Sequence, residues 1–183
     1  MNSSVHKKIM DTAFSLGAKD CIPILTRDIV LANWVRFKCQ YGCPLYGRSF
    51  SCPPFSPTLE QTKKVLAEYD SALLVHFQLP AGKGSKNSFK TIAEAMLELE
   101  AEAHRSNQYK AFAYVAGPCE MCEECKAKVT NDPTECHHRE KLRPSMESAG
   151  MDVFATAKNA GLELKVLEKG QDTFHGYALL LLE

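Results

Sequence analysis

The sequence predicts an α/β fold, a layered single domain with a mixed β-sheet, helices packed on it and two cysteine-rich metal-binding loops. Short apolar segments with strand character alternate with segments of helical periodicity along the 183-residue chain. The last two apolar segments leave no room for a helix between them, so they are expected to pair antiparallel. Such a pair beside strands joined by helices makes the expected sheet mixed. The length fits one domain over residues 1–183.

The helices are predicted from apolar spacing and from their end signals. The clearest is 90–106, where apolar residues recur at helical intervals. The other three are 4–16, a helix opened by Ser56 and Pro57, and a helix that starts at Pro144 and closes at Gly161.

Five short apolar segments are predicted to be strands. The continuous apolar run 72–77 is typical of a strand that is covered on both faces. The others are 21–25, 111–116, 163–168 and 176–182. Polar or cysteine-rich loops connect them, which is where a rigid scaffold carries functional residues.

Charge and cysteine content narrow the range of possible functions. The 22 basic residues equal the 22 acidic ones, so no general attraction to nucleic acid or anionic membranes is expected. No apolar stretch is long enough to cross a bilayer, and the first residues lack the pattern of a signal peptide. We therefore expect a cytoplasmic protein, in which eight cysteines indicate metal or redox chemistry rather than disulfides.

The loop 117–143 carries the strongest motif. Cys119, Cys122 and Cys125 form a C-x2-C-x2-C run, and Cys136 follows at a distance. Ferredoxins bind [4Fe-4S] clusters through such a triplet and a remote fourth cysteine. Four thiolates can also bind zinc, although zinc sites usually show two separated C-x2-C pairs, and unliganded thiols are the third alternative. The adjacent histidines 137 and 138 are interpreted as hydrogen-bonding to cluster sulfur or as facing solvent.

The loop 39–56 supplies three further candidate ligands. Cys39, Cys43 and Cys52 are spaced C-x3-C-x8-C, and a proline follows the second and the third cysteine. Two glycines in the loop permit the tight backbone that wrapping a metal requires. The sequence therefore predicts a second metal site, again with [4Fe-4S] favoured and zinc as the alternative.

The fourth ligand of this site is left open by the sequence. Cys21 either completes the site or is a small buried residue of a strand. Four thiolates would favour electron transfer, whereas an iron without a cysteine could bind a substrate or an exogenous sulfur as a Lewis acid. In that case Arg48 is the candidate cofactor-binding residue, which with Tyr41 and Tyr46 could orient an anionic ligand; the alternative is that these side chains only pack or hydrogen-bond to cluster sulfur.

Three segments carry specific motifs: Lys38-Cys39 through Cys52-Pro53-Pro54, Gly117-Pro118-Cys119 through Cys125, and Arg143-Pro144-Ser145-Met146-Glu147 with Gly150-Met151-Asp152-Val153. On these motifs the chain resembles a family of uncharacterised bacterial and archaeal proteins described as predicted metal-binding proteins. The resemblance runs from the first cysteine-rich loop almost to the C-terminus. It implies a cysteine-bound metal, an iron–sulfur cluster, and frequent occurrence in anaerobes, but no particular reaction.

Three functions remain open at this point. The first is an iron–sulfur electron carrier or redox subunit with two [4Fe-4S] clusters, which would serve a redox partner protein. The second is an enzyme that uses an open-site cluster, with a small-molecule ligand at iron, for desulfuration, dehydration or reductive chemistry. The third is a zinc-stabilised binding module. No Walker or Rossmann glycine motif is present, and no nucleic-acid or membrane partner is expected.

Overall fold

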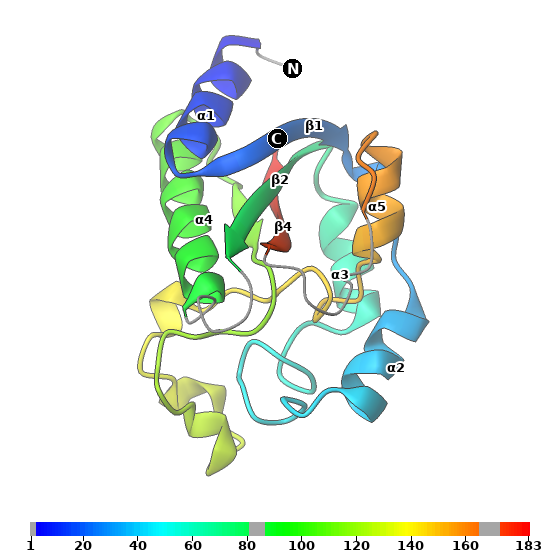
Figure 1. The fold of residues 1–183 in the computed structure, drawn as a ribbon, viewed down its shortest axis with the longest axis vertical. Helices are drawn as coiled ribbons and strands as arrows, with labels where there is room; N and C mark the ends of the chain where they lie inside the picture. Colours follow the sequence, from blue (N-terminus) through cyan, green and yellow to red (C-terminus); the bar gives the residue numbers. More distant parts are fainter. Residues whose placement is uncertain (1–2, 81–86, 165–172) are drawn as a thin grey trace.

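The computed structural model describes residues 3–80, 87–164 and 173–183 and confirms the α/β class. A four-stranded sheet has the order β1-β2-β4-β3 (Figure 1). Its strands are β1 (Ala18–Leu25), β2 (Ser71–Pro80), β3 (Phe112–Tyr114) and β4 (Thr173–Leu182).

The expected mixed sheet is wrong, because all three ladders of the described strands are antiparallel. The C-terminal strand β4 lies between β2 and β3 and runs against both of them. Of the expected strand 163–168, residues 163 and 164 have no regular structure and the rest lies outside the described residues, so its antiparallel pairing with the last strand stays a prediction.

One face of the sheet is covered by α1 (Ser3–Ser15) and α4 (Ser88–Arg105), as Figure 1 shows. Their apolar faces bury Ile9 and Leu99 against Leu73 and Leu180 of the central strands. Both helices were expected from their periodicity, and both are confirmed with ends shifted by one or two residues.

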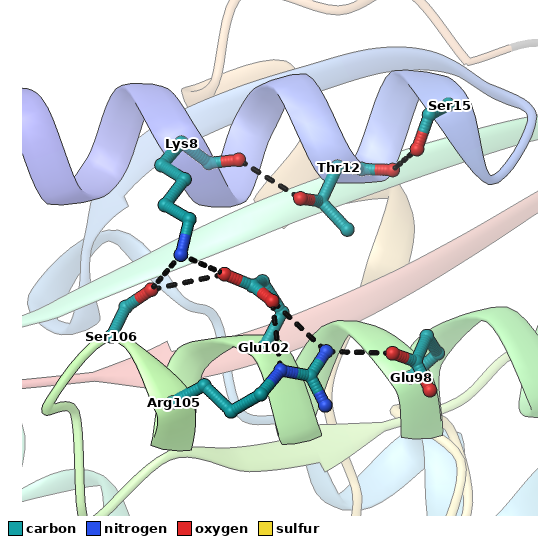
Figure 2. Close-up of polar contacts among 7 residues, drawn as sticks. All are labelled: Lys8, Thr12, Ser15, Glu98, Glu102, Arg105 and Ser106. Carbon is teal, nitrogen blue, oxygen red and sulfur yellow. Dashed lines mark hydrogen bonds and ion pairs between the residues drawn. The ribbon is translucent and has the colours of Figure 1, made fainter.

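An ion-pair network also joins these two helices at the surface (Figure 2). Lys8 on α1 lies 2.6 Å from Glu102 on α4, and Arg105 bridges Glu102 and Glu98. Because Lys8 and Arg105 are exposed, this network contributes little to the stability of the fold and mainly fixes how the two helices lie relative to each other.

The opposite face carries α3 (Leu59–Leu66) and α5 (Val153–Asn159) together with the segment 144–152. Helix α2 (Asn33–Gly42) lies beyond α3 and α5, at the cysteine-rich end of the molecule. A second core, with Leu74 and Leu179 from the sheet and Met146 and Met151 from that segment, fills the space between them. The strand β2 is thus buried on both faces, as its apolar run predicted.

Two expected helix starts are wrong. Helix α3 begins after Thr58, whose hydroxyl forms a capping box with Gln61, and not at Ser56-Pro57. Helix α5 begins after Asp152, whose carboxylate accepts the Ala155 amide, and not at Pro144.

Helix α2 was not expected at all, because its residues 39–42 were assigned to the first cysteine-rich loop. No side chain caps its N-terminus, and its aromatic residues Trp34, Phe37 and Tyr41, although at helical spacing, are exposed rather than packed in the core. The helix places Cys39 on its last turn and Cys43 at its C-cap.

None of the helices in the described ranges is long and apolar enough to cross a membrane. Figure 1 shows both cysteine-rich segments at the end of the molecule opposite the two chain termini. The scaffold therefore brings together two loops that are more than 60 residues apart in the sequence.

Candidate metal centres and an adjoining cavity

The first candidate centre lies where α2 ends and the chain folds back on itself. The amide of Gly47 donates to the carbonyl of Pro53 over 2.8 Å, and the amide of Cys52 donates to Ser49 over 3.0 Å. These turns bring Cys52 back to Cys39 and Cys43, and all three cysteines line one small cavity of about 130 Å³. The structure thus gathers the three candidate ligands that the sequence proposed for this loop.

Burial is the main influence on these thiols. It raises the pKa of Cys39 and of Cys52, and the charge of Cys43 raises both further. Arg36 partly opposes the shift at Cys39, and hydrogen bonds from Ser51 and Ser49 partly oppose it at Cys52. A bound cation would reverse this balance, because metal coordination favours the thiolate.

A buried carboxylate, Glu147, faces the same cavity from the segment after Pro144. Its Oε2 atom is buried and has no hydrogen-bond partner among the described residues. Burial raises the pKa of Glu147, and hydrogen bonds from its own backbone, Ser145 and the backbone of Gly117 partly oppose this shift. The sequence analysis did not single out this residue, although a carboxylate between Met146 and a run of small buried residues is an unusual pattern.

Arg36 is a cation beside this centre, since its charge acts on Cys39, and the role expected for Arg48 stays a prediction. Arg48 is exposed, and its amide closes a turn by donating to Leu45. The Nη1 atom of Arg36 donates to Ser56 Oγ over 2.8 Å and also to the carbonyls of Pro57 and Ser148. Arg36 therefore ties the first cysteine-rich loop to the segment that carries Glu147.

The second candidate centre is built on the loop 117–143. Its four cysteines, Cys119, Cys122, Cys125 and Cys136, are all half-buried. The loop turns before its last cysteine: the Asp132 carboxylate accepts the Thr134 amide over 2.8 Å, and a short 3-10 helix at Pro133–Glu135 leads into Cys136.

These four thiols lie within electrostatic range of one another. Burial raises the pKa of Cys119, and the charges of Cys125, Cys122 and Cys136 raise it further. The pKa of Cys122 is also raised by burial, and then by Cys136 and Cys125. His137 is exposed and His138 is half-buried, and neither influences these thiols.

One buried serine connects the two centres. The amide of Cys119 donates to Ser51 Oγ over 3.1 Å, and the same oxygen lies 3.8 Å from Cys52 Sγ. Ser51 is also hydrogen-bonded to Ser49 over 3.0 Å. A single hydroxyl group therefore contacts a candidate ligand of each centre, which makes the two centres direct neighbours.

Within the described ranges, no three histidine, cysteine, aspartate or glutamate side chains converge tightly enough to hold one metal ion. Four cysteines around one zinc would place their sulfurs about 3.8 Å apart, given a Zn–S bond of about 2.3 Å. Such a convergence of ligands is not present at either centre within the described residues.

A large cavity of about 570 Å³ adjoins the first centre. Cys39, Cys43 and Glu147 line one part of it, and His175 and Tyr177 of β4 line another. The rest of its wall is mostly apolar, with contributions from Trp34, Phe89, Phe154 and Phe174. Its size and lining are those of a small-molecule site.

A polar chain leads from the sheet into this cavity. Asp20 Oδ2 lies 2.7 Å from His76 Nδ1, and His76 Nε2 lies 2.9 Å from Nδ1 of His175. The ring of Tyr177 stacks on His76 with 4.5 Å between centroids. Burial lowers the pKa of His76, and Asp20 opposes this shift. The one sign of this polar chain in the sequence was His76, a histidine inside the apolar run of β2.

Cys21, the unassigned cysteine, lies in the core on the other side of the sheet. It is 4% exposed and packs among the residues between the sheet and helices α1 and α4. Burial raises its pKa to about 12. The large cavity is lined by residues of both cores, Ala116 and Tyr177 among them, but not by Cys21.

The fold and its two neighbouring cysteine clusters define an α/β protein with the ligand types of a metal-binding protein. The chain belongs to the family of predicted metal-binding proteins (DUF2284), whose model matches residues 23–182. No curated protein and no solved structure matches the chain. The family is described as predicted to bind metal, and the description names no metal.

Proposed function

We propose that the chain binds two [4Fe-4S] clusters, one at Cys39, Cys43 and Cys52 and one at the four cysteines of the second loop, and works as an electron carrier or redox subunit. The observation that carries this proposal is the contact of Ser51 with both Cys52 and the Cys119 amide. Neighbouring redox centres are what an electron-transfer protein requires.

The donor sets favour a cluster over a single zinc ion. Soft thiolates suit both, but a cubane takes each thiolate on a different iron and so accepts more widely spaced sulfurs. The C-x2-C-x2-C spacing of Cys119, Cys122 and Cys125 with a remote Cys136 points the same way. When bound, such clusters would supply one-electron chemistry.

The residues around the cysteines fit this role. Hydrogen bonds to cluster sulfur tune the reduction potential, and Ser51 is placed to provide one at Cys52. The second loop is largely exposed and carries both acidic and basic side chains, which would allow a redox partner protein to dock close to its cysteines.

Metal analysis of protein purified without oxygen tests the proposal. We expect about eight irons and matching acid-labile sulfide per chain, and about half of each in Cys122→Ser. Zinc in place of iron, without sulfide, would overturn the proposal and favour the zinc-stabilised module.

The large cavity favours a second candidate function. An enzyme with an open-site [4Fe-4S] cluster needs a pocket beside a centre that has fewer than four cysteines. The first centre has three cysteines, and two of them line a cavity of about 570 Å³. Desulfuration, dehydration or reductive chemistry on a small molecule fits this arrangement.

A further inference from the structure

We propose that the Glu147 carboxylate holds the fourth coordination position of the first centre, and that a thiolate with an apolar body displaces it from the large cavity. This inference rests on the proposed iron–sulfur function, and it names the ligand class of that site. The exchange is a ligand substitution: the carboxylate oxygen leaves the iron as the thiolate sulfur binds, and no electron is transferred.

The position of Glu147 is the first argument. The residue lines the small cavity together with Cys39, Cys43 and Cys52, and it lines the large cavity together with Cys39 and Cys43. Its charge influences Cys39 directly. Glu147 thus stands at the boundary between the three cysteines and the space that a ligand would enter.

The second argument is that Glu147 Oε2 is buried and has no hydrogen-bond partner among the described residues. A buried carboxylate oxygen without a partner is costly, whether the group is charged or neutral. The guanidinium of Arg36 does not relieve it, because the Arg36 hydrogen bonds go to Ser56, Pro57 and Ser148. An iron of a cluster bound by the three cysteines would supply the missing partner.

The third argument is that the backbone holds Glu147 in place. Ser145 and Ser148 on either side of it exchange three hydrogen bonds of 2.9 to 3.1 Å. The Met146 amide donates to the carbonyl of Val115, which anchors the turn to the chain just before Gly117. Such a rigid support is how proteins orient a metal ligand.

Chemistry makes this ligand exchangeable. A carboxylate is a hard donor, and iron in a sulfur-rich cluster prefers soft thiolates. Cys21, the one cysteine not assigned to either centre, is buried in the core beneath α1 and α4 and lines neither cavity. An incoming thiolate would therefore compete well with Glu147.

The cavity walls define the rest of the ligand. Apolar and aromatic side chains dominate the lining, including Trp34, Phe154 and Phe174. An aryl or alkyl group of moderate size would fill this space and lose contact with water. The ligand class that satisfies both the iron and the walls is an apolar thiol.

The test uses anaerobically prepared Cys122→Ser protein, in which only the first centre remains, with thiophenol as the probe and phenol as its oxygen counterpart. Thiophenol should change the paramagnetic resonance spectrum of the reduced protein, and phenol should not. In Glu147→Gln the spectrum without probe should change, and thiophenol should bind about tenfold or more tightly, because no carboxylate has to be displaced.

The exposed Glu60→Gln is the matched control and should behave like its parent. The proposal is overturned if Glu147→Gln leaves both the spectrum and the thiophenol affinity unchanged, or if thiophenol leaves the parent spectrum unchanged. If Glu147→Gln does not fold, the spectra of the parent with thiophenol and with phenol still test whether a thiolate binds at the first centre. A parent without iron and sulfide would instead refute the proposed function itself.

Discussion

Replacing Ser51 by alanine tests the contact between the two centres. Ser51 is buried, its Oγ accepts the Cys119 amide over 3.1 Å, and it is hydrogen-bonded to Ser49 over 3.0 Å. Alanine removes the acceptor and leaves a part-buried amide without a partner, which costs about 1–3 kcal/mol. Taking about 2 kcal/mol, the midpoint of thermal unfolding should fall by roughly 4–8 °C for a chain of this size.

Urea unfolding and thermal melts of the reduced protein, kept free of oxygen, measure this effect. The matched control is Ser15→Ala, which removes an exposed hydroxyl on α1 that donates to Thr12 (Figure 2) and should change the stability by less than about 0.5 kcal/mol. In the metal-loaded protein, Ser51→Ala should also shift the reduction potential of the first centre, because the Cys52 sulfur loses a neighbouring hydroxyl at 3.8 Å. Stability equal to that of the parent, with an unchanged potential, would refute the link.

Three further outcomes are expected. Glu100 accepts the Ala113 amide and lies 2.6 Å from the Arg143 guanidinium, so Arg143→Ala leaves its carboxylate without a countercharge. Urea unfolding should show a free energy of unfolding lower by about 3 kcal/mol, and a decrease below about 1 kcal/mol would contradict this. Because burial lowers the pKa of His76, the unfolded chain binds the proton more readily and stability should fall as the pH drops below about 6.5. Replacing His76 by glutamine should flatten urea-measured stability between pH 7 and 5.5, and an equally steep dependence would count against this reasoning. Cys21→Ala should keep the iron and sulfide of both centres, and loss of either would make Cys21 a ligand after all.

The elements that the sequence predicted best are those with strong local signals. Helices α1 and α4 carry regular apolar spacing, and strand β2 is a continuous apolar run, so each was predicted close to its observed bounds. Their residues contact the core in the way that their local pattern requires. Local information was sufficient for these elements.

The misplaced helix starts have a non-local cause. Pro144 resembles a first helical residue, but its carbonyl accepts the Val115 amide, and this pairing holds the chain in a turn until Asp152. The antiparallel sheet has a similar origin, because β4 inserts between two strands that precede it by many residues. Neither pairing leaves a mark on the nearby sequence.

The candidate site likewise contains residues that the local sequence predicted and residues that it did not. Cysteine spacing predicted both ligand groups, and the structure brings the members of each group together. Glu147, Arg36 and the pair His76–His175 were missed, because their roles depend on partners 20 to 112 residues away. The sequence also shows no sign that the two centres are neighbours, because the contact between them is a hydrogen bond from the Cys119 amide to Ser51.

Electron paramagnetic resonance of the dithionite-reduced, anaerobically purified protein tests the central claim most directly. Two reduced clusters that are neighbours through Ser51 should interact magnetically, giving a broadened or split spectrum that becomes a simple single-cluster spectrum in Cys122→Ser. No cluster signal in protein that contains zinc, or two independent signals without interaction, would contradict the account of two adjacent iron–sulfur centres.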